Sequence, residues 1–156
     1  MSDVLFLDSG PLGLITQPQR TREVVGITDW LIECLHAGAR VMVPAIVYYE
    51  IKRELLRANR TVGIARLDAF VSAAPDRYIP LTDDALRFAA ELWAQSRRTG
   101  RPTADATALD IDVLLAAQAL RLGRSPIVAT TNPKHLSQFV PAQLWSDIAP
   151  STFSRL

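Results

Sequence analysis

Three short apolar runs constrain the fold more than any other feature of this sequence. They are Val4-Leu5-Phe6-Leu7, Val41-Met42-Val43 and Ile127-Val128-Ala129-Thr130, and each ends at a proline or a cluster of turn residues. A run that is apolar at every position, without alternation, is typical of a strand buried on both faces. Segments with helical spacing separate the runs, so the chain alternates strand and helix. This alternation predicts a three-layer α/β/α fold around a mostly parallel sheet.

The segments between these runs carry recognisable helix signals. Thr21 and Thr82 are expected N-caps, and Gly38 and Gly123 stand where helices should end. Proline makes 78–81 a weak edge strand. The predicted helices cover 21–36, 45–58, 62–73, 82–98, about 109–122 and a turn at 134–139, with a loop over 101–109 and a last extended piece at 144–145. No repeat, low-complexity tract or linker interrupts this order, so residues 1–156 are expected to form one domain.

Composition narrows the class of protein. At 156 residues with 21% charged residues the chain resembles an ordinary soluble globular protein. No apolar run approaches the ~20 residues that cross a bilayer, and the N-terminus is not a basic signal-peptide start, so a cytoplasmic location is expected. Cys34 is the single cysteine, which excludes an internal disulfide and a cysteine-rich zinc site. Its helical spacing predicts a small core residue.

Three acidic residues occupy comparable places in this pattern. Asp8 ends the first buried strand, Glu50 lies in the helix after the second, and Asp112 lies near the start of the helix before the last. Asp110 fits the role of N-cap for that helix, which places Asp112 in its first turn. Strand ends and helix starts gather at one edge of a doubly wound sheet, so these acids are expected to converge, with Thr130 and Asn132 beside them.

Convergence of acids has an energetic consequence. Two carboxylates ~4 Å apart repel by about 4 kcal/mol at an effective dielectric of ~20. Three together either hold a proton at a raised pKa or recruit a cation. Oxygen ligands favour hard ions, so Mg²⁺ is the expected cofactor and Mn²⁺ a substitute.

Each residue also has a structural interpretation. Asp8 can shape a turn, Glu50 can be a solvated helix residue, and Asp105 and Asp110 can be caps. The basic residues Arg53, Arg57 and Arg101 would ordinarily be a solvated face, although they flank the predicted site and could contact phosphates. The net charge of +1 is uninformative about a nucleic-acid partner, because phosphate attraction depends on local charge.

Four motifs, in order, resemble those of PIN-domain proteins, and most of all the VapC-type toxins of bacterial type II toxin–antitoxin modules. They are Val-Leu-Phe-Leu-Asp8-Ser-Gly-Pro-Leu, Val-Pro-Ala-Ile-Val-Tyr-Tyr-Glu50-Ile, Asp112-Val-Leu-Leu-Ala-Ala-Gln-Ala and Ile-Val-Ala-Thr-Thr-Asn132-Pro-Lys-His-Leu. The resemblance covers about residues 4–139. It implies a Mg²⁺-dependent endoribonuclease on a five-stranded parallel sheet, a homodimer, and a cognate antitoxin that inhibits it.

By motif position, the resemblance makes Asp8, Glu50 and Asp112 the catalytic and metal-binding acids. A fourth acid that is often present in the family appears here as Asn132, a poorer cation ligand; Asp110 could replace it, and Asp105 less readily. Ser9 or Thr130 is expected to hydrogen-bond a carboxylate and orient it. The RNA target is left open by the sequence.

Two other functions remain open. A non-catalytic PIN-like module would bind RNA or protein with the acids as a structural feature. An aspartyl-phosphate phosphatase of the haloacid dehalogenase type would use Asp8 as nucleophile, but that chemistry expects a second acid where this chain has Gly10.

Overall fold

A parallel sheet runs through the centre of the molecule. The computed structural model describes residues 3–100, 105–122 and 125–154. Within these residues the sheet has five strands in the order β3-β2-β1-β4-β5, and every neighbouring pair is parallel. In chain order the strands are β1 Val4–Leu7, β2 Arg40–Pro44, β3 Tyr78–Ile79, β4 Pro126–Thr130 and β5 Ala142–Leu144. The predicted parallel α/β architecture is therefore confirmed.

The central strand β1 explains why its sequence is apolar throughout. All four of its side chains are fully buried. Leu5 stands between Val41 of β2 and Ile127 of β4, so its backbone is hydrogen-bonded on both sides while its neighbours are covered by helices. Burial of such side chains removes apolar surface from water at about 25 cal/mol per Å², which makes this strand the anchor of the fold.

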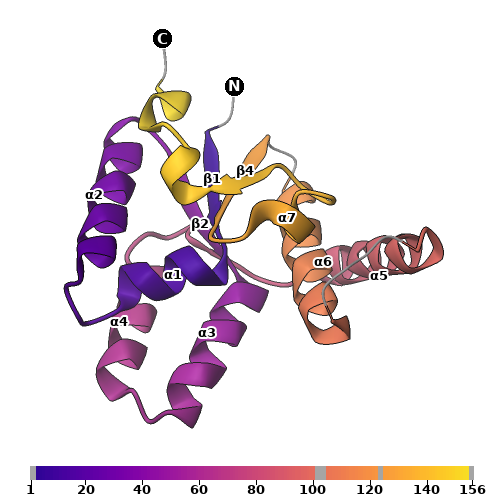
Figure 1. Ribbon diagram of the computed structural model, residues 1–156, viewed down its shortest axis with the longest axis horizontal. Coiled ribbons are helices and arrows are strands. Elements are labelled where there is room, and N and C mark those ends of the chain that lie inside the picture. The colour runs from indigo at the N-terminus through magenta and orange to yellow at the C-terminus, as the bar shows by residue number, and fades with distance from the viewer. Residues whose placement is uncertain (1–2, 101–104, 123–124, 155–156) are drawn as a thin grey trace.

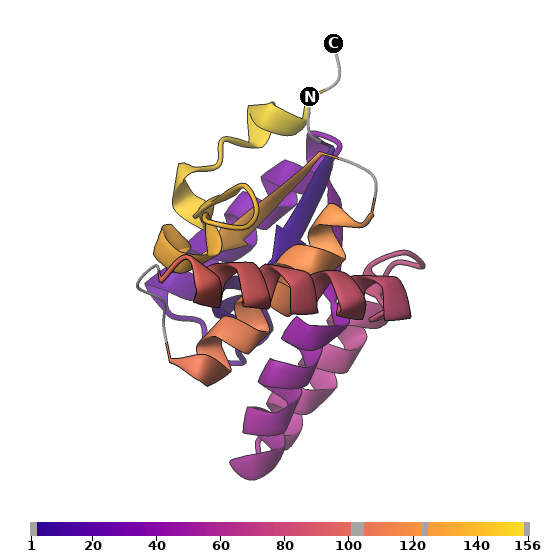
Figure 2. The same cartoon turned by 90° about the vertical axis from the view of Figure 1, so that its right-hand side faces the viewer.

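Helices cover both faces of the sheet. Figure 1 shows α1 and α2 on one side of the strands and α5 and α6 on the other, and Figure 2 shows the second pair face on. The helices are α1 Ser9–Thr16, α2 Arg22–His36, α3 Ala45–Arg57, α4 Thr61–Ser72, α5 Asp83–Arg98, α6 Ala106–Leu120 and α7 Pro133–Leu136, followed by the 3₁₀ turns η1 Trp145–Asp147 and η2 Pro150–Phe153. Cys34 of α2 is fully buried in the core, as predicted. No helix in the described ranges combines the length and apolarity that crossing a membrane requires.

The C-terminal turns pack onto α2. The indole N–H of Trp30 donates to the carbonyl of Ile148 over 2.8 Å, and the Trp30 and Trp145 rings lie 5.6 Å apart. Because both groups are buried, this contact fixes the chain end against the helix layer.

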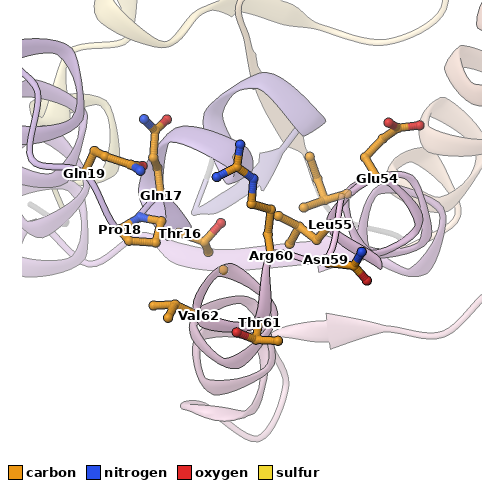
Figure 3. Close-up of a pocket in the computed structure, with 13 residues that line it drawn as sticks. Thr16, Gln17, Pro18, Gln19, Glu54, Leu55, Asn59, Arg60, Thr61 and Val62 are labelled. Carbon is orange, nitrogen blue, oxygen red and sulfur yellow. The ribbon is translucent and has the colours of Figure 1, made fainter. Parts of the chain in front are cut away.

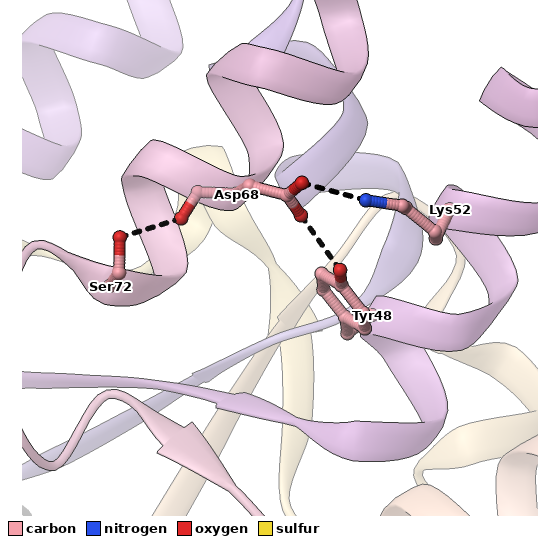
Figure 4. Close-up of polar contacts among 4 residues, drawn as sticks. All are labelled: Tyr48, Lys52, Asp68 and Ser72. Carbon is pink, nitrogen blue, oxygen red and sulfur yellow. Dashed lines mark hydrogen bonds and ion pairs between the residues drawn. The ribbon is translucent and has the colours of Figure 1, made fainter.

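A polar clamp joins α3 to α4, the two helices that project together beyond the sheet (Figures 1 and 2). Tyr48 Oη donates to Asp68 Oδ1 over 2.7 Å, and Lys52 Nζ donates to Asp68 Oδ2 over 2.7 Å (Figure 4). The Tyr78 ring meets the Tyr48 ring edge-on at 5.7 Å, which ties the pair of helices to the short edge strand β3.

The sequence analysis misses one helix, α1, and places the start of another, α6, too late. The turn expected at Asp8-Ser9-Gly10-Pro11 is the start of α1, with Asp8 as its N-cap. The loop expected over 101–109 is helical from Ala106, because Asp105 caps α6 by accepting from the Ala108 N–H over 2.9 Å. In both places the cap is an aspartate four residues before the first leucine, Leu12 in α1 and Leu109 in α6, which hid the helix start.

Candidate functional site

The candidate site lies where the strand order reverses. From β1 the chain proceeds to β2 and β3 on one side, whereas β4 and β5 lie on the other. A topological switch point of this kind, at the carboxyl ends of the strands, is where open α/β sheets bind their ligands. Asp8 directly follows β1, and Thr130 is the last residue of β4. The structure therefore places two predicted site residues at the expected crevice.

Asp8 is held by two hydrogen bonds. Its Oδ1 accepts from the Ser9 backbone N–H over 2.7 Å, and its Oδ2 accepts from Thr130 Oγ1 over 2.8 Å. Thr130 Oγ1 in turn accepts from the Asn132 N–H over 3.1 Å. The prediction that Ser9 or Thr130 orients a carboxylate is met by both, Thr130 through its buried hydroxyl and Ser9 through its backbone.

Burial raises the pKa of Asp8 above its ordinary value of 3.8. The two hydrogen bonds favour the charged form and oppose this effect, while repulsion from Glu50 adds to it. Asp8 is thus a fixed, strongly desolvated carboxyl group with a second acid near enough to influence it.

Close packing keeps the start of α1 against the loop after β4. A Cβ built on Gly10 would lie 2.7 Å from Thr131 Cγ2 and closer still to Thr131 Oγ1. Only a glycine admits this approach without a shift of the neighbouring chain. The position two residues after Asp8 therefore has no room for the second acid of an aspartyl-phosphate phosphatase.

Glu50 and Asp112 reach the same region from α3 and α6. Both are half-buried. Burial is the largest cause, and together with repulsion from Asp8 and then from Glu50 it raises the pKa of Asp112 from 3.8 to about 7. Charge repulsion therefore links the three acids, which lie more than forty residues apart in sequence, whereas their close convergence around a metal ion stays a prediction.

The donor set suits a hard cation, but its placement is looser than a finished metal site. All three groups are carboxylates, the ligand type that Mg²⁺ and Mn²⁺ prefer. Within the part of the chain that the structure describes, no group of three or more His, Cys, Asp or Glu side chains is arranged to hold a metal ion. Direct binding by all three acids therefore requires their side chains to move toward one another.

Two details of the predicted acid set are wrong. Asp105, not Asp110, is the N-cap of α6, so Asp112 lies in the second turn of this helix instead of the first. Asp110 is exposed, and at 100° per residue its side chain leaves the helix about 200° around from Asp112. Asp110 and Asp112 therefore belong to different faces, and the role of Asp110 as an extra ligand loses its geometric support.

Asn132 lies at the N-cap position of α7, and its side chain makes no capping hydrogen bond there. It is exposed, and its backbone is linked through Thr130 to Asp8. Asn132 is thus a neighbour of the site whose amide is not used by the adjacent helix.

The predicted RNA-binding arginines are partly engaged with other groups. The Arg53 guanidinium lies 5.2 Å from the centre of the exposed Tyr49 ring, and Arg57 pairs with Glu54 at 2.9 Å. Both stand on the same face of α3 as Glu50, one and two turns further along the helix. Arg101 lies outside the described residues.

A hollow that none of the three predicted acids lines lies elsewhere on the molecule. It has a volume of about 750 Å³ and opens between the end of α1 and the α3–α4 pair (Figure 3). Gly13, Thr16, Gln17, Pro18, Gln19, Ile51, Glu54, Leu55, Asn59, Arg60, Thr61, Val62 and Gly63 line it. Glu54 already pairs with Arg57, and the lining brings no further acid together. Size alone would favour this hollow as the functional site. The carboxyl groups with raised pKa values, Asp8 and Asp112, are instead associated with the carboxyl ends of the central strands.

Sequence reasoning missed one polar contact beside the site. Gln118 is buried in α6 and hydrogen-bonds both to the first turn of α3 and to the end of β3. The available signal was a single amide within the otherwise apolar stretch 113–120.

Comparison with solved structures identifies the type of fold. The chain is similar to one in the crystal structure of VapBC2 from Rickettsia felis bound to a promoter DNA fragment, with 15% identity, 91% of this chain and 98% of that chain covered, and a TM-score of 0.68. It is also similar to a chain of VapBC-1 from nontypeable Haemophilus influenzae, with 16% identity, 92% of this chain and 99% of that chain covered, and a TM-score of 0.65. For FitAcB from Neisseria gonorrhoeae the identity is 19%, the coverage is again 92% of this chain and 99% of that chain, and the TM-score is 0.65.

These likenesses confirm the fold that the sequence motifs predicted. Over nearly its whole length the chain shares the fold of these VapBC and FitAcB chains, in agreement with the PIN-like fold that the motifs predict. No protein-family model matches the sequence, and a search of curated proteins finds no match.

Proposed function

We propose that this protein is a divalent-metal-dependent endoribonuclease that acts as the toxin of a type II toxin–antitoxin pair. The observation that carries the proposal is the buried carboxylate of Asp8, held by the Ser9 N–H and the Thr130 hydroxyl at the switch point of the sheet, with Glu50 near enough to repel it. The similar folds in the VapBC and FitAcB structures support a cognate antitoxin as the proposed partner. RNA is the proposed substrate, Mg²⁺ the proposed cofactor and a homodimer the proposed assembly.

Each acid has a distinct part in this scheme. The Ser9 N–H and the Thr130 hydroxyl fix both oxygens of Asp8, so this carboxylate is the preorganised member of the set. Glu50 and Asp112 complete the set from two helices, and Asn132 is a further oxygen donor at its border. These groups would hold a divalent ion, which would supply Lewis-acid activation of a phosphodiester and of the attacking water. Arg53 and Arg57 are proposed to bind flanking phosphates, since they follow Glu50 along one face of α3.

Nothing in this chemistry requires the ribose 2′-hydroxyl. Attack of water in line with the leaving oxygen gives products with a 5′-phosphate and a 3′-hydroxyl. Preference for RNA must then come from the shape of the bound strand and from contacts to it.

The test uses purified protein freed of any antitoxin, incubated with structured and with unstructured RNA. The proposal expects cleavage that needs Mg²⁺ or Mn²⁺ and falls at least about 100-fold in Asp8→Asn. Asp110→Asn is the matched control, because this exposed acid lies on another face of α6; it should cut like the wild type. Metal-independent cleavage, or equal loss in both variants, would refute the proposed site.

A binding-only module is the second candidate, favoured by the absence, in the described residues, of a three-acid group already arranged for a metal. A module of this kind would bind RNA or protein in the presence of EDTA and would cleave no RNA with any added metal ion. Release of phosphate from monoesters without RNA cleavage would point instead to a phosphatase.

A further inference from the structure

Gln118 is a buried amide with two backbone partners in other elements. Its Oε1 accepts from the Ile46 N–H over 3.2 Å, and its Nε2 donates to the Ile79 carbonyl over 2.9 Å. Only 3% of the residue is exposed, and the neighbouring alanines of α6 are fully buried. The small neighbours let α6 come close enough to α3 and β3 for one side chain to reach both.

Both partners are backbone groups that local structure leaves without an ordinary partner. Ile46 is in the first turn of α3, where N–H groups have no intrahelical acceptor, and the preceding cap residue Pro44 supplies no side-chain acceptor. Ile79 is the last residue of β3 and stands in register with Pro44 of β2. Pro80 follows it, so the ladder stops at this point. The Gln118 amide therefore supplies an acceptor for the N–H after Pro44 in α3 and a donor for the carbonyl before Pro80 in β3.

The same contact joins the two helices that carry Glu50 and Asp112. Glu50 lies one turn beyond Ile46 in α3, and Asp112 lies six residues before Gln118 in α6, about 9 Å along the axis. A helix held at its first turn cannot slide or rotate freely against its neighbour. Asp8, by contrast, is fixed by its own hydrogen bonds at the end of β1.

We propose that Gln118 is a positioning residue that locks α3 against α6 and so sets the spacing between Glu50 and Asp112. The effect of Gln118 on metal binding rests on the proposed function, whereas its role in holding the two helices together does not. Metal binding and helix position are therefore measured in separate experiments.

The first measurement is the Kd for Mn²⁺ alone, by calorimetry, in the wild type and in Gln118→Met. Methionine has similar length and volume but neither hydrogen-bonding group. The expected result is a rise in Kd of about tenfold, the size found when groups that orient ligands are removed. Trp30→Phe is the matched control: it deletes the buried hydrogen bond to Ile148, far from the acids, and should leave the Kd unchanged at a comparable loss in Tm.

The second measurement is the distance between spin labels on α3 and α6, at Arg57→Cys and Thr107→Cys in a Cys34→Ala background. Gln118→Met should shift or broaden the distance distribution, and Trp30→Phe should not. If Gln118→Met does not fold, Gln118→Glu serves in its place, because it keeps an acceptor for the Ile46 N–H and removes the amide donor to Ile79; a smaller change in the same direction is expected.

The outcomes separate the two proposals. An unchanged distance distribution overturns the locking role. A changed distribution with an unchanged Kd overturns the role in spacing the acids. If the distribution changes but the wild type itself does not bind Mn²⁺, the locking role stands and the proposed metal site fails.

Discussion

Two faces of helix α3 have opposite effects on the carboxyl groups near them. On the side facing α4, Lys52 and Tyr48 donate to Asp68, and both hydrogen bonds hold the pKa of that carboxyl below its ordinary value. On another face Glu50 repels Asp8 and Asp112, whose pKa values are raised. Glu50 is two residues away from both Tyr48 and Lys52, so its side chain leaves the helix about 200° around from theirs. The clamp therefore stabilises the folded state when Asp68 is charged. The repulsion among Asp8, Glu50 and Asp112 destabilises the folded state, and a bound cation would offset this cost.

The largest expected effect on stability comes from removing one crowded charge. In metal-free protein at pH 8, Asp112→Asn should raise the free energy of unfolding by about 2 kcal/mol, after a discount for partial exposure. The pKa of Asp112 in the folded state, about 7, exceeds its ordinary value, so the charged form destabilises the fold as pH rises from about 4 to 7. Denaturant melts should therefore show the gain at pH 8 and none at pH 4. A loss of stability at pH 8 would give Asp112 a structural role instead.

Breaking the clamp should act with the opposite sign. Asp68→Asn keeps an acceptor for Tyr48 but removes the ion pair with Lys52, and should cost about 1 kcal/mol because both groups are partly exposed. Asp68 has a lowered pKa, so its contribution is present above pH 4 and is lost as the pH falls through the folded-state value. Asp76→Asn is the control, since its pairing with Arg40 is longer and more exposed; it should melt like the wild type.

A finer test separates repulsion from burial at Asp112. Glu50→Gln removes one repelling charge, so the pKa of Asp112 should fall below about 7 yet stay above 3.8, because burial is the larger cause. Carboxyl ¹³C chemical shifts against pH measure this directly. Glu54→Gln, one turn further along α3, should leave the Asp112 titration unchanged. No change in Glu50→Gln would mean that the two acids are not coupled.

The smallest expected effect concerns the arginines of α3. Arg57→Gln should change stability by less than about 0.5 kcal/mol, because its pairing with Glu54 is exposed. If Arg57 binds an RNA phosphate, the dependence of log K on log salt should decrease in slope by about one, as fluorescence anisotropy at several salt concentrations would show. An unchanged slope places the RNA path elsewhere.

The sequence predicted the strands better than the helix starts. β1, β2 and β4 are apolar on both faces, and that pattern has few alternatives. Helix α1 was missed altogether because Gly10 and Pro11 favour turns. Pro11 is nonetheless acceptable there, since its missing N–H falls among the first N–H groups of a helix, which have no intrahelical acceptor. The placement of Asp8 and Thr130 at the carboxyl ends of β1 and β4 followed from strand-end topology alone, whereas the close convergence of the three acids stays a prediction.

Contacts between distant side chains could not be predicted in the same way. Tyr48 and Asp68 lie on separate helices whose relative rotation no periodicity encodes, and the reach of Gln118 to β3 depends on how closely its alanine neighbours pack. The looseness of the acid set also depends on side-chain placement, which strand and helix patterns do not determine.

The short edge strands limit how this sheet can meet another chain. β3 has two residues and is followed by proline, and β5 has three before the chain turns into η1. An added strand at either edge could form only a few backbone hydrogen bonds, which protects the protein against edge-to-edge aggregation. A partner that binds tightly must therefore contact side chains of the helices or of the strand-end surface, and it cannot bind by extending the sheet.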